Sequence, residues 1–101
     1  MKMKYKISKK AGMDMENIWL YTFEKWSLEQ ADRYYNLIIN EIENITKFPE
    51  SGENYDDIRK GYKRTRIKSH FIFYKINAKD ECIEIIRILH QRMDIPSRLK
   101  E

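Results

Sequence analysis

The sequence predicts an α+β fold, in which an N-terminal strand and an antiparallel helical hairpin pack on a mainly antiparallel sheet. Apolar residues recur at three- and four-residue spacing through the first half of the chain, which is typical of amphipathic helices. Short apolar runs separated by turns follow in the second half, which is typical of strands. The chain has 101 residues, 42% of them hydrophobic, so residues 1–101 suffice for a single domain with a modest core.

An edge strand and a helix open the chain. Met3, Tyr5 and Ile7 alternate with lysines, and this pattern predicts a strand with one face in water. Ser8 can cap the helix that follows, which is predicted over residues 9–26. The buried stripe of this helix is expected to contain Ala11, Met15, Ile18, Thr22 and Trp26.

A second helix, predicted over residues 28–47, starts almost immediately. Ser27 and Gln30 have the spacing of a capping box, and Pro49 ends the helix. A join this short produces an antiparallel hairpin. Residues 49–52 are then expected to form a turn, followed by an acidic surface loop. The apolar stripe of the second helix is expected to contain Ala31, Tyr34, Tyr35, Ile38, Ile42, Ile45 and Phe48.

Three strands, predicted over residues 62–68, 70–76 and 81–90, complete the sheet. The last has the longest apolar run, which indicates a strand buried on both faces at the centre of the sheet. In an extended strand, positions 83, 85, 87 and 89 share one face, and positions 84, 86, 88 and 90 share the other. Arg87 and His90 are therefore expected to leave the strand on opposite faces.

Charge is unevenly distributed along the chain, although the net charge is only +4. Residues 1–23 have a balance of +3, residues 24–57 one of −6, and residues 58–101 one of +7. Residues 58–75 include seven basic side chains and no acidic one. A basic sheet segment favours an acidic partner, which is RNA, DNA or an acidic protein segment. The alternative is a solvated basic face that only aids solubility.

Composition also bears on the compartment and on bound groups. The single Cys82 excludes an internal disulfide and fits a reducing cytoplasm. No apolar run approaches the ~18 residues of a membrane span, and the first ten residues lack the apolar block of a signal peptide. Two histidines without a cysteine cluster make no metal-site pattern, and no motif indicates a cofactor.

An ordered set of residues extends over nearly the whole chain. Its members are Ala11, Asp14-Met15, Ile18, Tyr21-Thr22, Trp26, Gln30-Ala31, Tyr34, Phe48-Pro49, Gly52, Arg59, Gly61-Tyr62, Arg64, His70, Ile72-Phe73-Tyr74 and the run 85–94. Each piece is weak by itself, but the order, ending in Arg87-Ile88-Leu89-His90-Gln91-Arg92-Met93-Asp94, is specific. On these residues the chain resembles the ParE branch of the RelE/ParE toxins of bacterial toxin–antitoxin systems.

The resemblance implies a small toxin that a ParD-like antitoxin neutralises. Members of the ParE branch poison DNA gyrase by trapping it on cleaved DNA, whereas the RelE branch cleaves mRNA on the ribosome. The nucleases usually have an aromatic residue or a tyrosine near the C-terminus, but the last tyrosine here is Tyr74. We therefore expect a gyrase poison that acts by binding and has no catalytic residues. The alternative is a RelE-like ribosome-dependent endoribonuclease.

Basic side chains of the sheet segment are the candidate contacts for the antitoxin or the target. They are Lys63, Arg64, Arg66, Arg87, His90 and Arg92. In a nuclease, His90 and Arg87 would supply acid–base chemistry and charge stabilisation. In a binding protein, His90 caps the strand end, and Arg87 binds the antitoxin or pairs with an acid. His70, beside a turn, is expected to be structural.

The C-terminal tail and the aromatic residues of the hairpin are further candidate contacts. In the tail these are Met93, Ile95 and Leu99, and the last two have the spacing to dock as one helical turn. Alternatively the tail stays mobile until a target binds. The hairpin has more aromatic residues than its buried side can hold, so Trp19 and Tyr21 are expected to be partly exposed. Gyrase or a second copy in a homo-oligomer could bind them.

Overall fold

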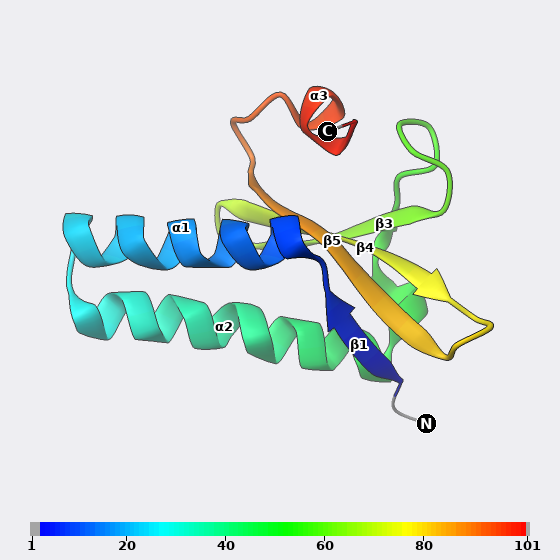
Figure 1. Ribbon diagram of the computed structural model, residues 1–101, viewed down its shortest axis with the longest axis horizontal. Helices are drawn as coiled ribbons and strands as arrows, with labels where there is room; N and C mark the ends of the chain where they lie inside the picture. The colour runs from blue at the N-terminus through cyan, green and yellow to red at the C-terminus, as the bar shows by residue number, and fades with distance from the viewer. Residues whose placement is uncertain (1–2, 101) are drawn as a thin grey trace.

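The fold has a helical hairpin on one face of a five-stranded sheet, within residues 3–100 that the computed structural model describes (Figure 1). The strand order is β1-β5-β4-β3-β2. Only β1 and β5 pair in parallel among these strands, and the other neighbours are antiparallel. The strands are β1 (Lys4–Ile7), β2 (Glu53–Asn54), β3 (Tyr62–Ile67), β4 (His70–Asn77) and β5 (Cys82–His90). This architecture confirms the predicted fold class.

The hairpin consists of α1 (Lys9–Lys25) and α2 (Leu28–Lys47), one residue shorter in α1 than predicted. Both predicted caps are present: the Ser8 hydroxyl accepts the Ala11 N–H at 3.0 Å, and the Ser27 hydroxyl accepts the Gln30 N–H at 3.1 Å. Each cap satisfies one of the four N–H groups that a helix start leaves without an intrahelical partner.

The main hydrophobic core lies between the hairpin and the sheet. The buried stripes of the two helices meet the isoleucines of β4 and β5 and the ring of Tyr74. Its buried residues are Ala11, Met15, Ile38, Ile42, Ile45, Ile67, Ile72, Tyr74, Ile83, Ile85 and Ile88. Burying an isoleucine side chain stabilises a fold by about 1.5–3 kcal/mol, so this cluster contributes most of the apolar stabilisation.

A second, smaller core covers the opposite face of the sheet. It forms where α3 (Ile95–Leu99) packs on the strands, on the other side from the hairpin (Figure 1). Its buried residues are Tyr62, Phe73, Leu89, Ile95 and Leu99. Ile95 and Leu99 are only 7% and 4% exposed, so the prediction that they dock as one helical turn is confirmed.

Three aromatic residues expected in the buried stripes are exposed instead. Trp26 is 68% exposed, Phe48 60% and Tyr35 38%. The joined end of the hairpin projects past the sheet, so no strand lies beneath the last turn of α1 (Figure 1). Helical periodicity cannot reveal where the opposing layer stops, and Phe48 is the non-helical C-cap residue at the other end of α2, so it leaves the stripe. The expected exposure of Tyr21 is confirmed, at 64%, and Trp19 is partly exposed.

The face alternation predicted for β5 is wrong across its middle. Ile85 and Ile88 both face the helices, although they are three residues apart. The β4–β5 register shifts between them and leaves Ile86 as an extra residue. One extra residue in an antiparallel pair reverses the face of all residues that follow it. Arg87 and His90 both follow it, so they still lie on opposite faces.

Backbone conformation explains two strand ends that differ from the prediction. Lys68 and Glu81 were expected in strands but have φ values of 52° and 50°. This left-handed conformation is incompatible with an extended strand, so β3 ends before Lys68 and β5 begins after Glu81. The expected loop after α2 contains a short 3₁₀ helix, η1 (Pro49–Ser51), and the two-residue β2.

Candidate functional site

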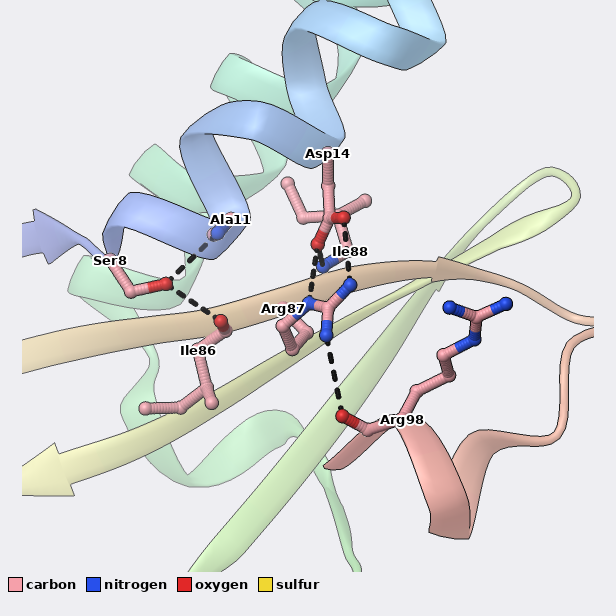
Figure 2. Close-up of polar contacts among 7 residues, drawn as sticks. All are labelled: Ser8, Ala11, Asp14, Ile86, Arg87, Ile88 and Arg98. Carbon is pink, nitrogen blue, oxygen red and sulfur yellow. Dashed lines mark hydrogen bonds and ion pairs between the residues drawn. The ribbon is translucent and has the colours of Figure 1, made fainter. Parts of the chain in front are cut away.

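Arg87 joins three elements at the centre of the molecule (Figure 2). Its guanidinium donates to the two carboxylate oxygens of Asp14 in α1, at 2.8 and 3.0 Å. The same guanidinium donates to the Arg98 carbonyl in α3 at 3.3 Å. The Arg87 and Asp14 side chains are only 12% and 13% exposed. A bidentate arginine–carboxylate pair of this kind is stronger than a neutral hydrogen bond. Losing one partner leaves the other charge largely buried and uncompensated.

Side chains of α1 also cover the free edge of β5. The parallel partner β1 ends opposite Ile85. Beyond that point, the Ser8 hydroxyl donates to the Ile86 carbonyl at 2.7 Å, and Asp14 accepts the Ile88 N–H at 3.0 Å (Figure 2). Backbone groups that are partly buried need such partners. The residue that caps α1 therefore also completes the sheet edge.

His90 lies on the helical face of β5, away from Arg87. Its Nδ1 accepts the Arg92 N–H at 3.1 Å, so the neutral ring carries its proton on Nε2. The ring meets His70 edge-on, with 5.1 Å between centroids. His90 therefore closes the strand end, as expected for a binding protein.

His70 is a structural residue within the same cluster. Its Nδ1 lies 2.7 Å from the Tyr34 hydroxyl, which also donates to the Ile67 carbonyl at 3.1 Å. Burial, and to a lesser extent the neighbouring His90, lower the pKa of His70 to about 4, against an opposing effect of Asp14. His70 is thus neutral near pH 7 and links α2 to the β3–β4 turn.

A cleft of about 950 Å³ lies between the projecting part of the hairpin and the end of the sheet. Its apolar lining comes mainly from Ile18, Tyr21, Trp26, Leu37, Ile88 and Met93. Asp14, Arg33, Lys68, His70 and His90 supply polar and charged lining. Because Asp14 is already bound to Arg87, the cleft presents apolar surface together with the positive charges of the exposed Arg33 and Lys68.

The opposite sheet face carries arginines stacked on aromatic rings. The guanidinium of Arg64 lies 4.1 Å from the ring centre of Phe71 and 4.7 Å from that of Tyr55, and it pairs with Glu53. Arg66 lies 5.8 Å from the Phe71 ring and bonds the Lys68 carbonyl and Gln91. Such stacking holds the guanidinium groups in defined positions.

The six basic candidates do not form one surface. Strand alternation places Arg64 and Arg66 on the α3 face, whereas Lys63 points to the helical side, where it lies 4.0 Å from Glu50. His90 is also on the helical side, and Arg87 is engaged by Asp14. Arg92 is exposed in the turn after β5. The six residues therefore divide between the two sides of the sheet and do not form a single face, and their role as contacts for the antitoxin or the target stays a prediction.

The three tail candidates also separate. Met93 is 42% exposed and lines the cleft, whereas Ile95 and Leu99 are buried beneath the tail helix. Only Met93 is thus placed for direct contact while the tail is docked.

Asp14 is the residue that sequence reasoning did not single out as a contact. Its position gives a usable signal, because it lies three residues after Ala11 and four before Ile18, on the inner side of α1. An acid on that side needs a cation, and Arg87 supplies one from β5, which is the second strand of the sheet and not its central strand as predicted.

Two further features concern bound groups and membranes. Among residues 3–100, no three His, Cys, Asp or Glu side chains are grouped so that they could hold a metal ion. Across the same residues, no helix is both long and apolar enough to cross a membrane.

Comparison with known sequences identifies the family. Residues 5–95 match the family model for the ParE toxin of the type II toxin–antitoxin system parDE. The chain is 36% identical over 95 residues to Toxin ParE1 of Caulobacter vibrioides, covering 94% of this chain and 96% of that protein. It is 33% identical over 99 residues to Toxin ParE1 of Mycobacterium tuberculosis, covering 98% of this chain and 100% of that protein.

Solved structures share the fold. A chain of the chromosomal ParDE toxin–antitoxin system from P. aeruginosa superposes with a TM-score of 0.76 at 16% identity, covering 88% of this chain and 96% of that one. A chain of the RelBE2 toxin–antitoxin complex from Mycobacterium tuberculosis gives 0.70 at 13% identity, covering 89% and 99%. From the family match and the identity to the two ParE1 toxins, the chain belongs to the ParE toxins of type II toxin–antitoxin systems.

Proposed function

We propose that this toxin poisons DNA gyrase by binding, without turning over a substrate. The observation that carries the proposal is the separation of Arg87 and His90. RNA cleavage needs a base for the 2′-hydroxyl, an acid for the leaving oxygen and a cation for the phosphate, all around one bond. Here Arg87 leaves β5 on the face opposite to His90 and is held by Asp14 at the edge of the strand, whereas His90 faces His70. This arrangement favours binding over nuclease chemistry.

Neutralisation by a ParD-like antitoxin belongs to the same proposal. The cleft suits an amphipathic helix with acidic residues, because much of its lining is apolar and Arg33 and Lys68 supply basic groups to it. Arg64 and Arg66 together form what we call the arginine face of the sheet. The Lys68 carbonyl accepts a hydrogen bond from Arg66, so the cleft adjoins this face. A segment that folds on binding could therefore cover the cleft and then turn over the sheet end toward Arg66.

The test is a gyrase assay with purified components and no ribosomes. We expect the folded toxin to raise the amount of gyrase-linked cleaved DNA, and preincubation with its antitoxin to abolish the effect. A matched reaction contains mRNA and ribosomes but no gyrase, and we expect the mRNA to stay intact. If the toxin leaves DNA uncleaved yet cuts mRNA on ribosomes, the RelE-like endoribonuclease is the correct function.

A further inference from the structure

Within the described residues, the C-terminal tail contacts the sheet through an apolar region and a polar region. Ile95 and Leu99 supply the apolar part, packed on Phe73 and Leu89. The polar part is the bond from Arg87 to the Arg98 carbonyl, at 3.3 Å (Figure 2). The tail helix spans only five residues, Ile95–Leu99, too few for a helix to be stable without tertiary contacts.

The direction of Arg87 depends on Asp14. The carboxylate accepts from Nε and from one terminal nitrogen of the guanidinium, and this leaves the other terminal nitrogen facing Arg98. Asp14 is itself held to β5 by the Ile88 N–H at 3.0 Å. Because the guanidinium is planar, hydrogen bonds at two of its nitrogens also fix the direction in which the third nitrogen donates. Lysine, which has a single ammonium group, cannot reproduce this fork.

We propose that Arg87 is a positioning residue that holds the tail in its docked conformation, with Asp14 as the residue that aims it. The proposal rests on the proposed function in one respect, namely that the docked tail presents Met93 to a binding partner beside the cleft. It assigns to the ion pair a role beyond stability: the pair couples α1, β5 and the tail.

Hydrogen exchange in the full chain tests this coupling. The reporters are the amides of Arg98 and Lys100, which donate to the Asp94 and Ser97 carbonyls at 3.1 and 3.3 Å. Amides in the middle of β4 report global unfolding. We expect Arg87→Lys to speed exchange of the tail amides about tenfold more than that of the β4 amides, because opening of the tail is a local event. A pair that only stabilises the whole fold would speed exchange of the β4 amides at least as much as exchange of the tail amides.

Two further variants make the result specific. Asp14→Asn keeps the size and one acceptor oxygen but loses the charge, so it should also loosen the tail selectively, even if Arg87→Lys folds poorly. Arg92→Lys makes the same chemical change in the exposed turn before the tail and should leave tail exchange as in the parent. Tail exchange within about twofold of the parent in both Arg87→Lys and Asp14→Asn, once corrected for the β4 amides, would overturn the proposal.

The gyrase assay separates this proposal from the proposed function. Loosened tails with reduced gyrase poisoning support both ideas. Loosened tails with full gyrase poisoning support the positioning role of Arg87 and overturn the tail as a target contact. Unchanged tail exchange overturns the positioning role, whatever the toxicity.

Discussion

At the scale of single residues, Tyr74 and Gly52 are fitted closely to each other. Tyr74 is fully buried, and its hydroxyl donates to the Pro49 carbonyl at 2.8 Å and accepts the Gly52 N–H at 3.0 Å. A methyl group on Gly52 would lie 2.8 Å from two ring carbons of Tyr74. Such a distance is too short for carbon atoms, so the ring or the loop would have to move.

The two glycines Gly52 and Gly12 should therefore respond oppositely to alanine. Gly52→Ala should destabilise the protein by about 1–3 kcal/mol, the usual cost of overpacking. Gly12 lies within α1 with nothing within 4 Å of an added methyl group, so Gly12→Ala should stabilise by about 0.5–1 kcal/mol. Urea unfolding of both variants checks this. Equal effects of the two substitutions would contradict the close fit at Gly52.

His70 should make stability depend on pH between 7 and 5. Its pKa is lowered from 6.5 to about 4, mainly by burial and then by His90. As the pH falls below 6.5, His70 becomes protonated in the unfolded chain but stays neutral in the folded chain. The free energy of unfolding therefore falls until the pH reaches about 4. From pH 7 to pH 5 the full shift would correspond to about 2 kcal/mol, and solvent screening of the partly exposed ring reduces the expected loss to about 1 kcal/mol.

The control for this pH effect is His70→Asn, which retains a polar group near the Tyr34 hydroxyl. In that variant most of the pH-dependent loss should disappear when urea unfolding is repeated at pH 7 and pH 5. A variant that loses as much stability as the parent would show that other groups cause the dependence.

At the scale of elements, the projecting end of the hairpin determines what the cleft offers. Trp26 and Tyr21 line the cleft, and they are 68% and 64% exposed. A helix that continues past its sheet keeps such rings in water at a free-energy cost. We infer that a partner offsets this cost by covering them.

Trp26→Ala should therefore reduce antitoxin binding far more than stability. Truncating a large ring at the centre of an interface typically costs about 2 kcal/mol or more of binding free energy. The cost to folding should stay below about 1 kcal/mol, because the side chain is largely exposed. Leu28→Ala is the matched control, since Leu28 is 53% exposed on the same hairpin but does not line the cleft. Calorimetric titration with the antitoxin measures the binding of both variants. Equal losses of binding free energy in Trp26→Ala and Leu28→Ala would argue against the cleft as the binding site.

At the scale of the whole molecule, charge is segregated between segments of the chain and not simply between the layers, since α2 has four acidic and two basic side chains, a balance of only −2. The segment that contains α2 has a balance of −6, and the segment that contains β3, β4, β5 and the tail has one of +7. The β3 arginines lie on the side of the sheet away from the hairpin. A partner that is acidic along part of its length is therefore attracted to one end and one side of the toxin.

Arg66→Glu should weaken antitoxin binding about tenfold at low salt, or about 1.4 kcal/mol, and should reduce its salt dependence. Lys9→Glu makes the same change in net charge at the exposed start of α1, remote from the arginine face, and should change affinity much less. Affinity measured at two salt concentrations distinguishes the variants. If both weaken binding equally, the attraction is a matter of net charge and not of the arginine face.

The candidate site was predictable in its residues but not in its arrangement. Arg87 and His90 stand out in the sequence because polar groups interrupt or end an apolar strand. Their placement on opposite faces followed from strand periodicity, and it survived the bulge at Ile86 only because both residues come after it. The partner Asp14 is 73 positions away in the chain, and no local pattern specifies a contact at that distance.

The sequence by itself determined the elements of this protein, their order and its family. Helical and strand periodicities, the serine caps and Pro49 are local features, and local physics acts on them whatever the rest of the chain does. Only the tertiary structure decided which side of the sheet each basic residue occupies, because one extra residue in a strand reverses the faces beyond it. It also decided that Trp26 is exposed and that Arg87 reaches both Asp14 and the tail, because these depend on where one layer ends over another.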